Sequence, residues 1–556
     1  MDAPKPLRTY TLMHDGTAAS YDEAMAVACI QGIVNRKAPE MATLSKRDTR
    51  PAFWLKLMAE GGRWLTGRPQ EPIGDLDALV RFAGKRLKGA VIWDPAVPAS
   101  ANVATTIAGL RDGVVLSPEM ADRALPVWKL PVLEDLRGRF TGAETGSAKN
   151  DAYRWAIREF LAKGMCSDHW ICLYEDPFSS RARGDIGYVV TRDWAVRNRS
   201  FVYDLSPWGD EVPQDDPKQP MGTDLATYHI MLKTLAERSS YTRMTEVAGF
   251  FAFSKYANMP DHPSRHEPVP TEWETVYVIS PYNCYQNTAA ADCYNQSMHC
   301  QAPRRPLKQR GRPAGVKLAD KAYVCVLMAD YDSTTPLYCF LPDHWADPVR
   351  GTIPLAWGLN PNLVETFPDI FAWLYDTATP NDTFGSDASA AGYVNPNRIE
   401  KEHLELFVKH NQRFFRECDM HMAPMVLDWA EPTADVKDAF TQFAPQGFAT
   451  IVMDMHTNVG GPPKPHVWKG MPVTELINDG CNFADVESQA RTMSNAINYR
   501  GVKKPGFYLF RIVWTGPGNV AKSVARLKEL RPELDIELVG PQDFFRLFKE
   551  VHGAKK

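Results

Sequence analysis

The sequence predicts an α/β protein whose C-terminal region is a TIM-like (β/α) barrel, complete or distorted. Apolar runs and helix-forming segments alternate from residue 322 to the end of the chain, which is typical of parallel βα units. About seven strands in roughly 235 residues match the size of such a barrel. Polar residues follow several apolar runs directly, as at the functional edge of a parallel sheet. A doubly wound open sheet is the alternative.

Two smaller α/β units are expected before the barrel, because 556 residues exceed what one hydrophobic core usually holds. In the first unit, Ser20 and Glu23 form a capping box that opens a helix, and short buried strands follow at 90–93 and 114–116. The second unit ends in a Cys- and Asn-rich linker. The predicted domains are 1–120, 121–320 and 321–556.

The middle unit shows helices and strands in alternation. The predicted elements are a helix at 152–162, strands at 170–174 and 201–205, a helix at 225–238, and strands at 249–253 and 276–280. Glu272 and Trp273 precede the last of these strands. At a domain edge they would reach into a cleft, so we assign both to substrate binding.

The C-terminal domain continues the βα rhythm. Its predicted strands are 324–328, 353–357, 422–427, 449–453, 471–477, 507–514 and 536–539, and its predicted helices are 363–375, 400–416, 434–443, 486–500, 520–530 and 543–551. A loop at 381–397 has neither a helical nor a strand period. Ordering such a loop costs entropy, so we expect it to have a function.

Composition excludes some classes of partner. With 63 basic and 67 acidic residues, the net charge is −4, which gives no electrostatic footprint for nucleic acid. No apolar run approaches the roughly 20 residues that span a bilayer. The 15 Trp and 20 Tyr offer faces on which sugar rings stack, although most aromatic residues are expected in the core.

Acidic and aromatic residues recur at the carboxyl ends of the predicted barrel strands, where a barrel carries its site. Glycoside cleavage needs a proton donor and a second carboxylate, with aromatic platforms nearby. Asp330 and Asp332 lie two residues apart, so in extended geometry they point the same way, and their mutual repulsion would raise one pKa. We predict that the catalytic residues are Asp330 and Asp332 with Asp428 or Glu431. The substrate-binding candidates at the same edge are Trp357, Asn360, Trp429, Asp454, His456 and Trp514.

Three other interpretations stay open. Each Asp at a strand end has a structural alternative as the cap of the next helix. The same acids with His344, His421 and His456 suit a metal-dependent polysaccharide deacetylase or phosphoesterase, but no compact ligand spacing such as HExxH occurs, so we predict neither a metal site nor a cofactor. The third interpretation is a non-catalytic carbohydrate-binding protein, which needs no pair of carboxylates.

A loop motif resembles that of a known family. Residues 390–396 read AAGYVNP and resemble the signature of the GxGYxYP family of putative glycoside hydrolases, with Ala390 in place of the first glycine and Asn395 in place of the second tyrosine. Further similarity lies at 31–36, 270–274, 350–354 and 378–382. The resemblance implies a glycoside hydrolase that acts on a carbohydrate substrate.

We place Asp387 and Tyr393 of this loop in the substrate site. Gly392 and Pro396 would fix a sharp turn that presents the Tyr393 phenol. The resemblance also favours an extracellular or periplasmic location, with the cytoplasm as the alternative. An exported protein would allow a disulfide among Cys284, Cys293 and Cys300, whereas a cytoplasmic one would keep free thiols.

Overall fold

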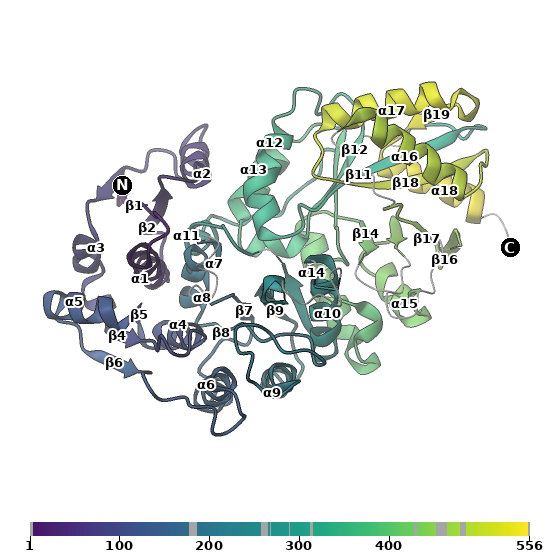
Figure 1. Cartoon of the computed structure of the whole chain (residues 1–556). Coiled ribbons are helices and arrows are strands. Elements are labelled where there is room, and N and C mark those ends of the chain that lie inside the picture. The colour runs from purple at the N-terminus through teal and green to yellow at the C-terminus, as the bar shows by residue number, and fades with distance from the viewer. Residues whose placement is uncertain are drawn as a thin grey trace. The chain divides into compact units, whose positions relative to one another are not determined.

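The structure is a computed structural model that describes residues 4–176, 186–256, 265–266, 268–288, 290–311, 315–426, 431–451, 464–478 and 485–553. The chain divides into two compact units (Figure 1). The first unit contains Met1–Pro303 and Glu365–Asp369, and the second contains Arg304–Val364 and Ile370–Lys556. Mixed α/β structure with parallel sheets is found in both, as the sequence predicts.

The first unit contains three parallel sheets, in the strand orders β2-β1-β3, β5-β4-β6 and β10-β9-β7-β8. Its strands are β1 (Leu7–Leu12), β2 (Met41–Ser45), β3 (Gln70–Ile73), β4 (Gly89–Ile92), β5 (Gly113–Leu116), β6 (Val132–Asp135), β7 (Trp170–Leu173), β8 (Phe201–Tyr203), β9 (Thr245–Gly249) and β10 (Cys284–Asn287). Its helices are α1 (Ala18–Val34), α2 (Arg50–Ala59), α3 (Leu76–Ala83), α4 (Ser100–Arg111), α5 (Pro118–Trp128), α6 (Ala148–Ala156), α7 (Gly187–Val190), α8 (Arg192–Asn198), α9 (Thr223–Arg238), α10 (Pro268–Ile279) and α11 (Gln296–His299).

Helix α1 is buried on nearly all sides and packs against β5 and α8. Its first turn is capped by Thr17, whose hydroxyl accepts from the Ser20 backbone N–H, so the helix begins before the predicted Ser20 cap. The one amide that α1 buries deeply is satisfied: Gln31 donates to Asn295 at 2.7 Å and accepts from Thr43 at 2.6 Å. Such pairing is what a polar group needs in a core.

The second unit contains two sheets, in the strand orders β13-β12-β11-β18 and β14-β15-β17-β16, in which only β16 pairs antiparallel among the described strands. Its strands are β11 (Ala322–Ala329), β12 (Leu355–Gly358), β13 (Asp382–Gly385), β14 (Met422–Met425), β15 (Gly447–Thr450), β16 (His466–Trp468), β17 (Met471–Glu475), β18 (Gly506–Val513) and β19 (Ile536–Leu538). Its helices are α12 (Leu341–Trp345), α13 (Pro368–Thr377), which begins in the first unit, α14 (Leu404–Glu417), α15 (Ala434–Thr441), α16 (Val486–Tyr499), α17 (Pro517–Leu530) and α18 (Pro541–Gly553).

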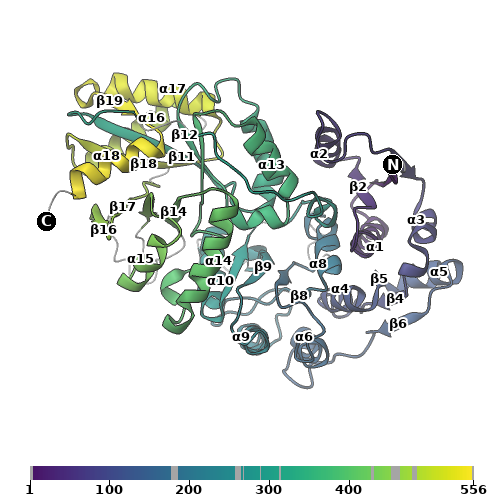
Figure 2. The same ribbon diagram turned by 180° about the vertical axis from the view of Figure 1, so that it is seen from behind.

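Strand β11 forms the centre of the second unit. It pairs with β18 along its whole length and is buried at every residue. Helix α18 packs Phe544 and Phe545 into the core cluster that contains Tyr323, Cys325 and Leu327 of β11. In both views, α16 and α17 lie side by side near β18 (Figures 1 and 2).

The parallel strands of the second unit are interrupted at β19. This strand pairs with Ala322–Val324 of β11, so β12 reaches β11 only at Leu327 and Met328. The two sheets are joined by few backbone hydrogen bonds, which run from Ser386 N to Met422 O at 3.2 Å, from Ile477 N to Leu509 O at 2.8 Å and from Arg511 N to Ile477 O at 2.9 Å. These contacts are fewer than a strand ladder provides, so a closed barrel stays a prediction.

The predicted strand at 249–253 is displaced, because β9 ends at Gly249 and a 3-10 helix begins at Phe253. The predicted strand at 276–280 is wrong, because residues 276–279 belong to helix α10. Prolines are tolerated in a first helical turn, and Thr271, Thr275 and Ile279 are buried at four-residue spacing. The β-branched run therefore packs as one face of a helix.

No helix in the described ranges is both long and apolar enough to cross a bilayer. Cys284 and Cys300 are free thiols. The proposed domain boundary at residue 120 stays a prediction.

Candidate active site

Three aspartates and one arginine meet at the carboxyl ends of the central strands of the second unit. Asp330 and Asp332 follow β11, Asp387 follows β13, and Arg511 lies inside β18. One carboxylate oxygen from each aspartate lies within 4.8 Å of the others. We call these four residues the carboxylate cluster. It brings together Asp330 and Asp332, which the sequence analysis placed after a strand, and Asp387, which it placed in the loop at 381–397.

Arg511 connects two of the carboxylates. Its guanidinium contacts Asp330, and its Nε donates to Asp387 Oδ1 at 3.3 Å. Asp387 also accepts from the backbone N–H of Asp330 at 2.7 Å and of Ala388 at 2.9 Å. A Cβ at Gly358 would lie 2.8 Å from the Asp387 Cβ, so glycine at the end of β12 makes room for this side chain.

Asp332 lacks a cationic partner of its own. Its side chain is buried at 1% exposure, and Oδ1 accepts from the Tyr393 hydroxyl at 2.5 Å. Oδ2 is buried and has no hydrogen-bond partner among the described residues. Burial raises the pKa of Asp332 well above its usual range, and the nearby charges of Asp387 and Asp330 raise it further. The group is therefore suited to hold a proton near neutral pH.

Burial also raises the pKa of Asp330, although the guanidinium of Arg511 opposes that rise. Burial by itself lowers the pKa of Arg511, but the charges of Asp330, Asp387 and Asp332 outweigh it, so the pKa is raised and the guanidinium stays charged. Three carboxyl groups thus share one cation, and the cluster as a whole favours protonation of one of them.

Arg511 is the site residue that the sequence analysis missed. The signal that identifies it is an arginine in the middle of the apolar strand GFYLFRIV. A charge in a buried strand requires a partner, and the strand-end aspartates are that partner.

The backbone around the cluster is strained. Positive φ angles, which non-glycine residues rarely adopt, occur at Asp330 (62°), Ala388 (37°), Ser389 (89°), Ala390 (85°) and Trp514 (48°). Ala390 thus adopts a glycine-like conformation at the position where the family signature has glycine, and Gly392 does so with φ 101°. Strained residues of this kind gather at active sites and ligand clamps.

Trp514 provides an open aromatic surface beside the cluster. Its side chain is 49% exposed, its indole N–H donates to the Asp330 carbonyl at 2.9 Å, and its ring packs edge-on against Phe340 with centroids 5.1 Å apart. The hydrogen bond of the indole N–H fixes the ring, and the exposed part of the ring is suited to stacking against a sugar ring.

Other predicted residues are not members of the carboxylate cluster or are not described. Trp357 is fully buried, and its indole N–H donates to Asp382 at 2.9 Å, so it serves the core. Glu431 is exposed. Glu272 and Trp273 are half-buried on α10 of the first unit. The predicted residues outside the described ranges are Asp428, Trp429, Asp454 and His456.

Asn360 follows β12 and is fully buried, yet neither its amide oxygen nor its amide nitrogen has a partner among the described residues. A buried amide without hydrogen bonds costs about 1–3 kcal/mol per group. A ligand or ordered water that completes these bonds would remove that cost, which agrees with its predicted role in substrate binding.

Of the histidines named for a metal site, His344 and His421 do not join the cluster, and His456 lies outside the described residues. His344 contacts the Tyr331 hydroxyl, and His421 lies 3.4 Å from Asp419. The three oxygens of the cluster are close enough for one divalent ion, but Arg511 already places positive charge there.

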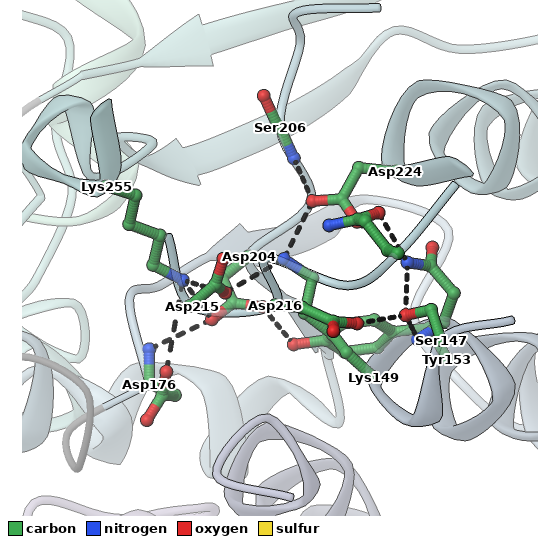
Figure 3. A network of polar contacts seen from close by, with 12 residues as sticks. Ser147, Lys149, Tyr153, Asp176, Asp204, Ser206, Asp215, Asp216, Asp224 and Lys255 are labelled. Carbon is green, nitrogen blue, oxygen red and sulfur yellow. Dashed lines mark hydrogen bonds and ion pairs between the residues drawn. The ribbon is translucent and has the colours of Figure 1, made fainter. Parts of the chain in front are cut away.

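A second group of buried charges lies in the first unit, where strands β7 and β8 end (Figure 3). Lys255 Nζ lies 2.9 Å from Asp204 and 2.8 Å from Asp215, and Lys149 Nζ lies 2.8 Å from Asp215 and 2.7 Å from Asp224. Its carboxylates include those of Asp176 and Asp204, which the sequence analysis did not select although they follow predicted strands. The lysine–aspartate network consists of Lys149, Lys255, Asp176, Asp204, Asp215 and Asp224.

Both lysines of this network are paired with carboxylates, which outnumber them four to two. Burial lowers the pKa of Lys149, but Asp215 and Asp224 outweigh burial and leave it raised. Burial also lowers the pKa of Lys255. The charges of Asp204 and Asp215 outweigh burial and raise this pKa well above its usual range. For Asp215, burial raises the pKa and the two lysines lower it, with a lowered pKa as the result. Both ammonium groups are therefore fixed as cations.

Fold and site define a multidomain α/β protein with a buried acidic centre at the carboxyl edge of a parallel sheet. Residues 320–549 match the GxGYxYP putative glycoside hydrolase C-terminal domain, and residues 87–165 match the second domain of the GxGYxYP N-terminal region. The two matches together span more than half of the chain, which therefore belongs to the GxGYxYP family of putative glycoside hydrolases. No curated protein sequence matches it.

The fold is shared with a solved structure. A crystal structure of a putative hydrolase from Bacteroides thetaiotaomicron superposes with a TM-score of 0.70 at 16% identity, over 99% of this chain and 95% of that one. At this identity the likeness concerns the fold alone. A putative polysaccharide deacetylase from Mycobacterium smegmatis is 13% identical over 44% of this chain and 96% of that one, with a TM-score of 0.26, which is too low to indicate a common fold.

Proposed function

We propose that this protein hydrolyses a glycosidic bond in an oligo- or polysaccharide, with the carboxylate cluster as the catalytic site on a distorted βα barrel. The observation that carries the proposal is the Asp332 carboxyl group, which is buried, raised in pKa and unpaired at Oδ2. Glycosidases need such a group to protonate the leaving oxygen.

In this proposal Asp332 is the general acid. Its Oδ1 is held by Tyr393, which leaves Oδ2 as the oxygen that carries the proton. That proton passes to the glycosidic oxygen as the bond from this oxygen to the anomeric carbon breaks. Tyr393 fixes the direction of the transfer, so it acts as a positioning residue.

Asp330 is the second carboxylate. It is the most accessible of the three, with a side chain 27% exposed, whereas Asp387 is fully buried and held by two backbone N–H groups. The oxygens of the cluster lie within 4.8 Å, nearer to the roughly 5–5.5 Å of retaining glycosidases than to the roughly 6.5–9.5 Å of inverting ones. This separation supports a nucleophilic role for Asp330 and retention of configuration.

Substrate binding is supported by Trp514 and Asn360. The indole is open on one side and fixed at Asp330, so a sugar stacked on it would lie beside the nucleophile. The amide of Asn360 offers two N–H donors and an acceptor oxygen that the described residues leave unused. Sugar hydroxyls need both.

A metal-dependent polysaccharide deacetylase is the second candidate. The close approach of three carboxylate oxygens favours it, because hard divalent ions bind such oxygens. The guanidinium of Arg511 opposes it, since a cation entering the cluster would be repelled by a fixed positive charge. The two candidates differ in the bond broken and in their need for a metal.

The test is a panel of defined glycans assayed for new reducing ends and, in parallel, for released acetate. We expect wild-type protein to produce reducing ends, and Asp332→Asn to lower turnover by at least about a hundredfold, the usual scale for a general acid. Asp376→Asn is the matched control, because Asp376 is exposed on α13; its turnover should equal wild type.

Activity should also survive a chelator. Loss on chelation with recovery on adding a divalent ion, together with acetate release, would replace this proposal with the deacetylase. Binding of glycans without any cleavage would support the non-catalytic alternative, and full activity of Asp332→Asn would remove Asp332 from the reaction.

A further inference from the structure

The first unit contains a cleft of about 630 Å³ at the carboxyl ends of β1 and β3. It is bordered by the segment that follows β1, by the segment 74–77 that follows β3, and by the end of helix α5. This volume lies within the roughly 300–1,000 Å³ that is usual for small-molecule sites.

The position of the cleft follows from the strand order β2-β1-β3. After β1 the chain passes through α1 to β2 on one side, and after β2 it passes through α2 to β3 on the other side of β1. The segments that leave β1 and β3 therefore diverge. Ligands of open parallel sheets bind in the crevice at such a switch point.

Three carboxylates in the cleft are each held through a single oxygen. Glu23 Oε1 accepts from the Tyr10 hydroxyl at 2.6 Å, Asp75 Oδ1 accepts from Ala78 N at 2.7 Å, and Asp77 Oδ1 accepts from the Trp128 indole at 2.7 Å. In the part of the chain that the structure describes, the second oxygen of each has no hydrogen-bond donor. The cleft thus presents carboxylate oxygens that accept no hydrogen bond from the described residues.

Aromatic and apolar side chains line the same cleft. Trp128 is half-buried, and Met13 and Val127 are each 61% exposed. The cleft carboxylates are not among the acidic groups whose oxygens converge within 4.8 Å in the described ranges, so they are too dispersed to hold one metal ion. Dispersed acceptors beside an aromatic face match a ligand with several hydroxyl donors and an apolar face, which is the chemistry of a sugar ring.

We propose that this cleft is a non-catalytic saccharide-binding site, with Trp128 as the stacking surface and Asp77, Asp75 and Glu23 as acceptors for sugar hydroxyls. The inference goes beyond the proposed hydrolysis, because no bond is broken here. It needs only that the protein meets a carbohydrate.

The test is isothermal titration of the full-length Asp332→Asn protein with the same glycan panel, so that bound sugar is not consumed. Further variants are made in this background. We expect two classes of site, one of which weakens at least tenfold on Trp128→Ala and on Asp77→Asn. Met221→Ala and Asp122→Asn are the controls: Met221 is 67% exposed and Asp122 is an exposed charge on α5, and neither lines the cleft. Trp128→Phe, which keeps a ring, should retain most of the affinity.

The outcomes separate this inference from the proposed function. A single class of site that Trp514→Ala abolishes and Trp128→Ala leaves unchanged would overturn the cleft and leave hydrolysis standing. Trp128-dependent binding by a protein that cleaves no glycan would confirm the cleft and overturn hydrolysis. Equal losses in the two control variants would show that the binding is not specific to the cleft.

Discussion

The carboxylate cluster and the lysine–aspartate network both bring aspartates together at the carboxyl ends of parallel strands, yet they differ in how the individual carboxylates are paired. In the network, two ammonium groups contact the carboxylates of Asp204, Asp215 and Asp224 at 2.7–2.9 Å. In the cluster, one guanidinium serves Asp330 and Asp387, and Asp332 receives only a neutral hydroxyl.

The backbone conformation also differs between the cluster and the network. Asp330, Ala388–Ala390 and Trp514 adopt positive φ around the cluster, whereas the residues of the network are absent from the positive-φ set. Strain and an unneutralised acid both cost stability, and proteins retain such costs mainly where they serve function. The two groups therefore share acidic residues at strand ends but differ in the pairing of each carboxylate and in backbone strain.

The largest expected effect is on the network. Lys255→Met removes the cation shared by Asp204 and Asp215, both almost fully buried. Breaking a buried pair from one side costs about 3–5 kcal/mol, because an uncompensated charge stays behind. Urea unfolding followed by tryptophan fluorescence should show this loss.

Lys163→Met is the control for that experiment, since Lys163 is 57% exposed in its pair with Glu159 and should change stability by less than about 0.5 kcal/mol. A loss of under about 1 kcal/mol for Lys255→Met would mean that the network is solvated, and the contrast with the cluster would fail.

A smaller effect of opposite sign is expected at the cluster. Burial, Asp387 and Asp330 raise the pKa of Asp332 in the folded state, so the folded protein binds this proton more tightly than the unfolded chain, and stability falls as pH rises above the ordinary Asp value of about 4. Asp332→Asn cannot ionise. It should therefore be more stable than wild type at pH 8, by roughly 1–3 kcal/mol, and similar to it at pH 4.

Asp215→Asn tests the other side of the comparison. Burial raises the pKa of Asp215, but the charges of Lys149 and Lys255 lower it by more. The pKa of Asp215 is therefore below its usual value. Its stabilising effect is present above the ordinary Asp pKa and is lost as pH falls below it. The asparagine variant should thus be less stable than wild type at pH 8. Thermal unfolding of both variants between pH 4 and 8 measures the two signs, and equal signs would contradict the comparison.

Sequence reasoning reached part of this site and stopped for physical reasons. Asp330 and Asp332 follow from an apolar run that ends in acids, and Asp387 and Tyr393 from the loop that resembles the family signature. Arg511 lies within a strand, whereas the rule used to select site residues considers only residues at strand ends. The neutralising lysines of the network come from other segments of the chain, so counter-charge could not be read from local pattern.

The sequence also predicted part of the fold. The βα rhythm of the second unit gives most of its strands, because buried parallel strands leave a clear apolar signal. Strand β13 was missed, because it lies in the segment 381–397 that was predicted to be an irregular loop. The insertion of β19 beside the first half of β11 depends on long-range pairing, which no local period encodes. Helix α10 was missed because β-branched residues favour strands by propensity, and packing overrides that preference.

The smallest expected effect concerns the strain itself. Ala390 and Ala391 are adjacent and almost fully buried, but only Ala390 has a positive φ, at 85°. Replacing either with glycine removes one buried methyl group and adds the same freedom to the unfolded chain, each worth roughly 0.5–1 kcal/mol of lost stability. At Ala390 the change also removes the left-handed penalty of about 1–2 kcal/mol for a residue with a Cβ. Ala390→Gly should therefore leave stability nearly unchanged while Ala391→Gly lowers it, and the difference between the two unfolding free energies measures the strain held in the loop beside Asp332. Equal losses at both positions would show that the loop is unstrained, and the backbone half of the contrast with the network would have to be abandoned.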